Sequence, residues 1–292
     1  MNLQETFTTH LSKHNLVKEK LLLMISGGVD SRSLFEIAKN TLPKEQIAVF
    51  HLNHNLRKNS VQDFEFVENL CKENDIKFYG YTLKKTEKSN ENLWRKERQK
   101  LAKESAKDFG ATKTLTAHHA TDLAETMIFR LTKGCGIDGL APFDISTKPF
   151  WKIPKSELEN FAKENKLEFC TDETNEDTTY ERNLIRHNVL PELRKITPNL
   201  EKVFVKEFQI FSETQNFLDS QLHSTNTPIP LKTFSELPQT LKRELLRKIA
   251  KQTPSFAEIE DCLKWLERNP KGKSKKEVGG TKLEILNGKL NW

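Results

Sequence analysis

Short apolar runs alternate with amphipathic stretches over the first 133 residues of the chain. The runs, which predict buried strands, are residues 21–25, 46–53, 77–83 and 113–117. Apolar side chains recur at helical spacing in the stretches that follow them, residues 32–39, 60–74, 91–109 and 120–133. Strands that alternate with helices in this way are typical of an α/β domain built on a parallel sheet.

The second half of the chain is less regular. Glycine and proline interrupt the pattern between residues 138 and 152, and Ser156 with Glu159 then predicts a capping box at the start of a helix. Two further helices are expected at 181–195 and from 198 to about 222. The Ser/Thr/Pro-rich residues 224–230 resemble a linker.

We therefore predict a domain at residues 1–195, a helical connector and linker at 196–230, and a small, mostly helical domain at 231–292. Within the last domain we expect helices from about Pro238 and Ser255, and two short strands after Gly280.

Composition narrows the class of protein. The 292 residues are 36% hydrophobic and include 18 Phe, enough to fill a core. The net charge of +6 permits an anionic partner without identifying one. The four cysteines are widely spaced and form no Cys-x-x-Cys pair, so neither a zinc knuckle nor a disulfide framework is indicated. With no signal-peptide pattern and no apolar run of membrane-spanning length, we expect a soluble, cytoplasmic protein without a membrane partner.

The strongest local signal is Ser26-Gly27-Gly28-Val29-Asp30-Ser31, between the first strand and the first helix of the alternation. Two glycines permit a sharp turn, and the amides at the helix N-terminus suit a phosphate group. No lysine follows, as a Walker A loop requires, and the third glycine of a Rossmann turn is missing. The alternative is a plain Gly-Gly turn in which Asp30 simply favours the helix start. A literal G-x-G-x-x-G match at 134–139 follows a helix, and we reject it as a dinucleotide site.

A second cluster follows the fourth predicted strand. If a helix begins near His118, then His118, Asp122 and Glu125 lie on one face over two turns. Partly buried carboxylates without a cation are costly, and a metal ion or a cationic ligand would remove that cost. The alternative is that Asp122 favours the helix start and His118 is a core histidine. Because parallel strands end at a common rim, Ser26, His54 and His118 should lie near one another.

Cationic residues accompany these stretches. Arg95 and Arg98 are one turn apart and either contact a ligand or form a solvated face. Arg182 and Arg186 lie four apart, either to clamp phosphate or to pair with Glu173, Glu176 or Asp177. The basic residues 271–276 are expected to be a solvated turn, with RNA contact as the alternative.

Together, in this order and spacing, the motifs resemble those of tRNA(Ile)-lysidine synthetases, in the PP-loop or N-type ATP pyrophosphatase superfamily. They are Ser26 to Ser31, His51-x-Asn-His-x-Leu-Arg57, Glu91 with Arg95 and Arg98, Thr116 to Thr126, and Tyr180-x-Arg-Asn-x-Ile-Arg186. The resemblance covers residues 21–193 strongly and weakens from 234 onward. Lys148 departs from it, at a position where the family usually has arginine. The chain resembles the short members of the family.

The resemblance implies a Rossmann-like, adenine nucleotide alpha hydrolase-like catalytic domain with a small C-terminal tRNA-binding domain. It implies that ATP, with Mg²⁺, adenylates the carbonyl oxygen on carbon 2 of the wobble cytidine in isoleucine tRNA with a CAU anticodon, releasing pyrophosphate. Free L-lysine then displaces AMP to form lysidine. The sequence leaves the oligomeric state open, and a homodimer is compatible with the family. The competing hypotheses are a PP-loop enzyme that thiolates tRNA and a non-catalytic tRNA-binding protein.

The resemblance also implies roles for individual residues. The ATP-binding residues are Ser26, Gly27, Gly28, Val29, Asp30 and Ser31, with Asp30 near magnesium. The catalytic residues are Asp30, His118, Asp122 and Glu125; of these the last three, with Arg98, face lysine or cytidine. Arg57, Arg95, Arg182 and Arg186 are the expected tRNA contacts. Either His118 or Glu125 could take the proton from the lysine amine.

Overall fold

The computed structural model describes residues 2–53, 60–83, 91–171, 181–222, 227–268 and 274–292, without the side chains of 91 and 92. The chain forms two compact units, Met1–Gln209 and Ile210–Trp292, whose boundary lies within helix α10 (Leu200–Leu222). In the described ranges every helix is too short or too polar to cross a lipid bilayer.

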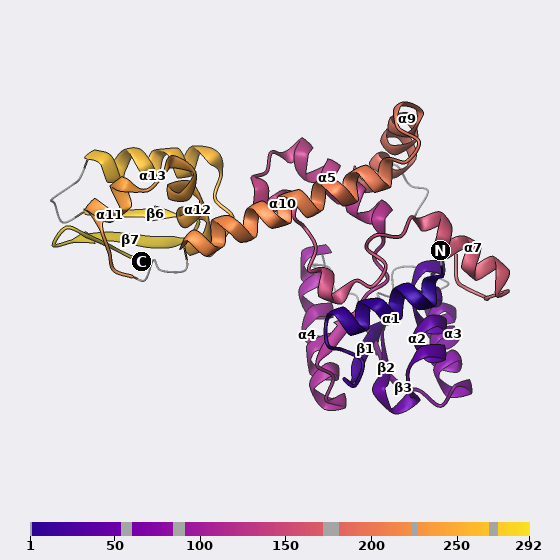
Figure 1. Cartoon of the computed structure of the whole chain (residues 1–292). Helices are drawn as coiled ribbons and strands as arrows, with labels where there is room; N and C mark the ends of the chain where they lie inside the picture. The colour runs from indigo at the N-terminus through magenta and orange to yellow at the C-terminus, as the bar shows by residue number, and fades with distance from the viewer. Residues whose placement is uncertain (1, 54–59, 84–90, 172–180, 223–226, 269–273) are drawn as a thin grey trace. The chain divides into compact units, whose positions relative to one another are not determined.

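Unit 1 is built on a parallel four-stranded sheet with the order β3-β2-β1-β4 (Figure 1). The strands are β1 (Leu21–Met24), β2 (Ile47–Asn53), β3 (Lys77–Thr82) and β4 (Lys113–Leu115). The connecting helices are α2 (Val29–Thr41), α3 (Ser60–Glu73) and α4 (Glu91–Phe109), and α5 (Ala120–Lys133) follows β4. In the register, Leu21 lies beside Ile47 on one side and Lys113 on the other. The predicted α/β fold with a parallel sheet is confirmed.

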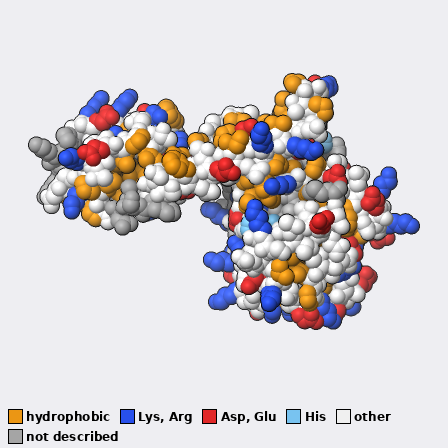
Figure 2. Space-filling view, viewed as in Figure 1, with side chains coloured by type: hydrophobic (Ala, Val, Ile, Leu, Met, Phe, Trp, Pro, Cys, Tyr) orange, Lys and Arg blue, Asp and Glu red, His pale blue; other side chains and the backbone are white. Residues whose placement is uncertain are grey.

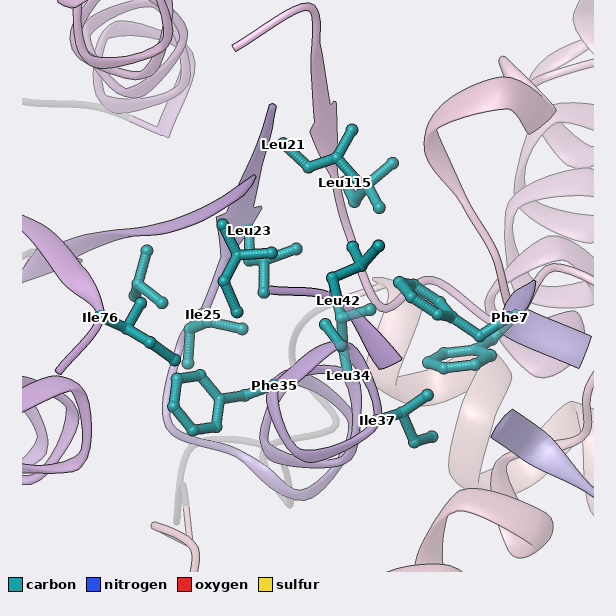
Figure 3. Close-up of a cluster of buried hydrophobic side chains, with 14 of the residues drawn as sticks. Phe7, Leu21, Leu23, Ile25, Leu34, Phe35, Ile37, Leu42, Ile76 and Leu115 are labelled. Carbon is teal, nitrogen blue, oxygen red and sulfur yellow. The ribbon is translucent and has the colours of Figure 1, made fainter. Parts of the chain in front are cut away.

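The core of unit 1 lies on both faces of the sheet. On one face Leu21, Leu23 and Ile25 pack against α2 (Figure 3), and on the other Leu22 and Phe50 pack against α4. The first core also takes up a helix that the sequence analysis did not predict, α1 (Leu3–Lys13). Its Leu3, Phe7 and Leu11 recur every four residues and are buried, and Asn2 caps its N-terminus. Each buried side chain of this size contributes about 1.5–3 kcal/mol.

Short helices complete unit 1. They are η1 (Lys44–Gln46), α6 (Ile137–Leu140), η2 (Ile145–Thr147), α7 (Lys155–Glu164), α8 (Glu181–Leu184), the π-helix η4 (Ile185–Val189) and α9 (Leu190–Ile196). The predicted capping box at Ser156 is wrong, because Pro154 occupies the N-cap of α7 and Ser156 already lies inside the helix. The helix predicted at 181–195 is present, but a π-helical turn interrupts it.

Unit 2 has its own hydrophobic core and an antiparallel sheet with the order β5-β8-β7-β6. Its elements are β5 (Ile229–Pro230), α11 (Leu231–Glu236), α12 (Gln239–Ile249), α13 (Phe256–Arg268), β6 (Ser274–Val278), β7 (Thr281–Leu286) and β8 (Lys289–Asn291). The two predicted helices and the two strands after Gly280 are confirmed.

Two expectations for this region are wrong. Ile229 and Pro230, assigned to the linker, pair with β8, and the end of the predicted basic turn is strand β6. Lys275 there pairs with Glu284 at 3.0 Å, and Lys276 pairs with Asp261. Lys and Arg side chains are interspersed with acidic ones on the face seen in Figure 2, so charge alone marks no nucleic-acid surface among the described residues of that face.

Candidate active site

The predicted phosphate loop connects β1 to α2 and requires glycine at position 27. Gly27 has φ +96°, and a Cβ added there would lie 3.2 Å from Cys170 Sγ. Its carbonyl accepts a hydrogen bond from the Cys170 amide at 3.0 Å. Both the backbone conformation and the lack of space therefore exclude larger residues.

Ser31 holds this loop in shape. Its hydroxyl accepts hydrogen bonds from the amides of Ser26 (3.1 Å) and Gly27 (3.2 Å) and donates to the Gly28 carbonyl at 2.9 Å. Gly28 is the N-cap of α2 and offers no side chain to the amides of the first turn, where Val29 and Asp30 lie. An uncapped helix N-terminus beyond a rigid strand is suited to binding an anion.

Asp30 reaches the start of α5 through His119. This buried histidine, 1% exposed, is the N-cap of α5: its Nδ1 accepts the Asp122 amide at 3.2 Å, and Asp122 Oδ2 accepts the His119 amide at 3.0 Å. The other ring nitrogen, Nε2, lies 3.6 Å from Asp30 Oδ2 and 3.4 Å from Asp122 Oδ2. Burial opposes the charge on this ring, but the carboxylates of Asp122, Asp30 and Glu125 outweigh it and raise the pKa of His119.

This contact lies where ligands bind in open α/β sheets. The loops after the neighbouring strands β1 and β4 meet at His119 and Asp30, with β2 on the other side of β1. The order of the strands reverses at this point, which is the usual position of a ligand-binding crevice.

His118 is not in the helix, so the predicted three-residue stripe is wrong in its geometry. Helix α5 begins at Ala120, and His118 precedes the cap. Its Nδ1 lies 2.7 Å from Thr116 Oγ1, and its ring packs edge-on against Phe143 at 5.8 Å. Neighbouring groups desolvate the ring and lower its pKa; Lys148, His119 and Arg98 lower it further, while Asp122 opposes them. The charges of Asp122 and Arg98 thus both act on His118.

Glu125 already has a cation from the chain itself. Arg186 Nε lies 2.6 Å from Glu125 Oε1, and Arg186 Nη2 lies 2.9 Å from Oε2 and 3.6 Å from Asp122 Oδ1. Burial disfavours the guanidinium, but Glu125, Asp122 and Asp30 raise its pKa. The premise that Glu125 lacks an intrinsic cation is therefore wrong.

The two predicted clamp arginines both face α5. Arg182 is exposed, and its guanidinium lies over the Phe129 ring at 5.9 Å from the ring centre, one turn along α5 from Glu125. Arg186 lies within the π-helix, a distortion that is frequent at functional sites. The alternative partners Glu173, Glu176 and Asp177 lie outside the described residues, as do Arg57 and His54.

A metal ion on the predicted stripe is not supported. Within the described ranges no three His, Cys, Asp or Glu side chains are arranged to hold one. Asp30 Oδ1, by contrast, is buried and has no hydrogen-bond partner among the described residues. Arg95 is exposed on α4.

Three side chains near the site were given no role from the sequence. The first is His119, the N-cap of α5. His51 is 4% exposed, and its Nδ1 donates to the Ile25 carbonyl at 2.8 Å, just before the phosphate loop. Lys148 Nζ lies 5.2 Å from the Phe143 ring centre, and burial lowers its pKa. A polar residue near a strand end beside a glycine loop is the signal that could have given His51 a role.

Comparison with known proteins agrees with these features. Residues 2–193 match the family model of the PP-loop domain. The chain is 32% identical over 256 residues to a tRNA(Ile)-lysidine synthase of Thermosipho africanus, covering 82% of this chain and 59% of that protein. It is 33% identical over 213 residues to a tRNA(Ile)-lysidine synthase of Thermotoga sp., covering 69% and 51%. The chain thus spans about half to three fifths of the length of these relatives.

A solved structure shows the same fold. The U34-tRNA thiolase NcsA from Methanococcus maripaludis, with its [4Fe-4S] cluster, has a TM-score of 0.57 at 15% identity, covering 72% of this chain and 80% of that one. The relatives confirm the resemblance inferred from the motifs. The glycine loop after the first strand meets the loop after β4, and the family model matches most of the chain. The chain therefore belongs to the PP-loop domain family.

Proposed function

We propose that the protein is an ATP-dependent ligase that joins free L-lysine to carbon 2 of the wobble cytidine in isoleucine tRNA with a CAU anticodon. The product, lysidine, switches codon recognition from AUG to AUA. The observation that carries this proposal is the contact of His119 with both Asp30 and Asp122. It joins a phosphate-binding loop to an acidic cluster, as a reaction between a nucleotide-activated base and an amine requires.

Residues 26–31 would hold the ATP phosphates. Magnesium is usually bound by one or two protein carboxylates together with substrate phosphates. Asp30 Oδ1, which has no hydrogen-bond partner among the described residues, fits that need. Bound there, the ion would neutralise charge that develops on the phosphates during adenylation. The other steps are assigned to the chain's own side chains.

Lysine must lose a proton before its amine attacks, and His118 is the better candidate for this role. Desolvation lowers the pKa of His118, so the ring is neutral near pH 7 and accepts a proton. Glu125 is occupied by Arg186. We assign the Asp122 carboxylate to the attraction of the lysine ammonium, and Arg98, whose charge acts on His118, to contact with the cytidine or its adenylate.

The remaining contacts to tRNA are assigned to exposed cations. Arg95 on α4 and Arg182 on α8 have exposed side chains that suit phosphate groups. Arg57 and the small C-terminal domain are assigned to the same role on the resemblance alone. Residues 1–195 form the catalytic domain in this proposal.

The test is incubation of the protein with ATP, Mg²⁺, labelled lysine and a transcript of isoleucine tRNA with a CAU anticodon. We expect label at the wobble base, dependent on ATP. A methionine tRNA transcript with the same anticodon is the matched control and should stay unlabelled. Absence of label from the isoleucine transcript, with the folded protein, would contradict the proposal.

A further inference from the structure

The two ring nitrogens of His119 have different environments. Nδ1 accepts the Asp122 amide, so it carries no proton in this arrangement. The proton of the neutral ring is therefore on Nε2, which faces Asp30 Oδ2 and Asp122 Oδ2 at 3.6 and 3.4 Å. One side chain thus caps a helix and at the same time presents an N–H group to two carboxylates.

The two oxygens of the Asp30 carboxylate have different surroundings. Its Oδ2 faces His119, and its Oδ1 is buried with no hydrogen-bond partner in the part of the chain that the structure describes. A buried oxygen without a partner is costly unless a ligand completes it. The orientation of Asp30, and hence the position of Oδ1, depends on what holds Oδ2.

We propose that His119 is a positioning residue: its Nε2–H fixes the Asp30 carboxylate so that Oδ1 is available to the divalent cation that accompanies the nucleotide. The inference rests on the ATP-dependent activation proposed above. It also explains how Asp30 and Asp122 stay close to one another, because an N–H group lies between two carboxylates that would otherwise repel. The other oxygen of Asp122, Oδ1, lies 3.6 Å from Arg186 Nη2.

Two substitutions separate the roles of the ring nitrogens. In His119→Asn the amide oxygen replaces Nδ1 and keeps the helix cap, for which asparagine is a preferred residue, but nothing replaces Nε2. In His119→Gln the amide nitrogen reaches the position of Nε2, while the cap is lost. The two variants have the same polar group, and they differ only in where it reaches.

The experiment measures binding of Mn²⁺, a paramagnetic substitute for Mg²⁺, by electron paramagnetic resonance in the presence of a non-hydrolysable ATP analogue. We expect His119→Asn to keep its melting temperature but to bind Mn²⁺ at least about tenfold more weakly, as Asp30→Asn should. His119→Gln should melt at a lower temperature yet retain Mn²⁺ affinity within about threefold. Affinity for the analogue in EDTA should be unchanged in both, because the loop amides do not involve His119.

The outcomes are distinguishable. If the wild-type protein binds no Mn²⁺ with the analogue, the proposed function fails. If the wild type binds Mn²⁺ and His119→Asn binds it equally well, the positioning role of His119 is wrong. Equal losses in the Asn and Gln variants would also overturn it, because the site would then need the imidazole ring itself and not its Nε2–H.

Discussion

Arg186 forms a two-point ion pair with Glu125, with N–O distances of 2.6 and 2.9 Å across 61 residues of sequence. The two residues were predicted for different partners, Glu125 for a substrate amine and Arg186 for tRNA. Their pairing makes Asp122 and Glu125 unequal, since Arg186 takes both oxygens of Glu125 whereas Asp122 Oδ2 lies 3.4 Å from His119 Nε2. The acidic cluster therefore has one structural carboxylate and one that suits a ligand.

Loss of Arg186 should destabilise unit 1. Arg186→Gln would leave the carboxylate of Glu125, 3% exposed, without its cation, at a cost of about 3 kcal/mol. Arg182→Gln is the matched control on the same helical segment and should cost less than about 1 kcal/mol, because it removes only an exposed contact with Phe129. Urea denaturation of both variants measures the difference. Equal stabilities would show that the ion pair contributes little.

Asp122→Asn should impair the use of lysine more than adenylation. Asparagine retains an oxygen for the His119 amide, so the start of α5 is kept, but the charge that attracts an ammonium group is lost. Pyrophosphate release is to be measured with and without lysine in the presence of tRNA. We expect the lysine-dependent part to fall about 100-fold and the lysine-independent part to fall less. An equal loss in both would refute the assignment.

Asp30→Asn tests whether the protein is an enzyme at all. Because Asp30 is the proposed magnesium ligand, its neutralisation should slow pyrophosphate release by about 10²–10³-fold. Binding of tRNA should be unaffected. Wild-type and variant proteins that release pyrophosphate equally slowly would instead favour a non-catalytic tRNA-binding protein.

Removal of the cysteines separates lysidine formation from thiolation. Burial raises the pKa of the Cys71 and Cys262 thiols to about 12, which leaves them unreactive at neutral pH. We expect a protein with alanine at 71 and 262 and serine at 135 and 170 to incorporate lysine within about threefold of wild type. A product that contains sulfur, lost with the cysteines, would contradict the proposal.

His10 should make the folded state sensitive to acid. Its Nε2–H donates to the Ser146 carbonyl at 3.1 Å. Burial, helped by the nearby charges of His14 and Lys13, lowers the pKa of His10 from 6.5 to about 4. The hydrogen bond to Ser146 and the charge of Asp144 oppose this shift but are outweighed. Between these values the unfolded chain binds a proton that the folded chain does not. Titration of His10 therefore costs no stability above pH 6.5. Below that pH it lowers the free energy of unfolding, by up to about 3 kcal/mol as the pH approaches 4.

The control for this effect is His10→Gln, whose amide can still donate to Ser146 but does not titrate. Thermal unfolding between pH 7.5 and 4.5 should show a steeper loss in wild type than in the variant. Parallel curves would mean that His10 is not responsible. The comparison cancels the other histidines, because both proteins contain them.

Much of the fold could be predicted because its elements carry strong local patterns. The bounds of α4 and α5 agree with the expected ones, since each combines a clear apolar period with a glycine or a polar cap at an end. Helix α1 was missed although Leu3, Phe7 and Leu11 share one face, because three apolar residues in a short polar segment are a weak signal. The π-helix leaves no mark in the sequence that periodicity could detect.

The site was harder to predict than the fold. The sequence analysis placed His118 on one helix face with Asp122 and Glu125, whereas in the structure His118 precedes the cap of α5 and the neighbouring His119 contacts Asp30. The pairing of Glu125 with Arg186 is tertiary, and the pattern along one helix says nothing about a cation 61 residues away. Roles of single residues toward ATP, lysine and tRNA remain predictions.

The contact between His119 and Asp30 also bears on the order of folding. The two residues come together only when β4 pairs with β1, although β2 and β3 lie between these strands in the sequence. Closing loops of this length is slow compared with forming a helix, so the contact between His119 and Asp30 should be among the last features of unit 1 to form. Nucleotide-dependent cation binding should therefore report complete folding more strictly than helix content does.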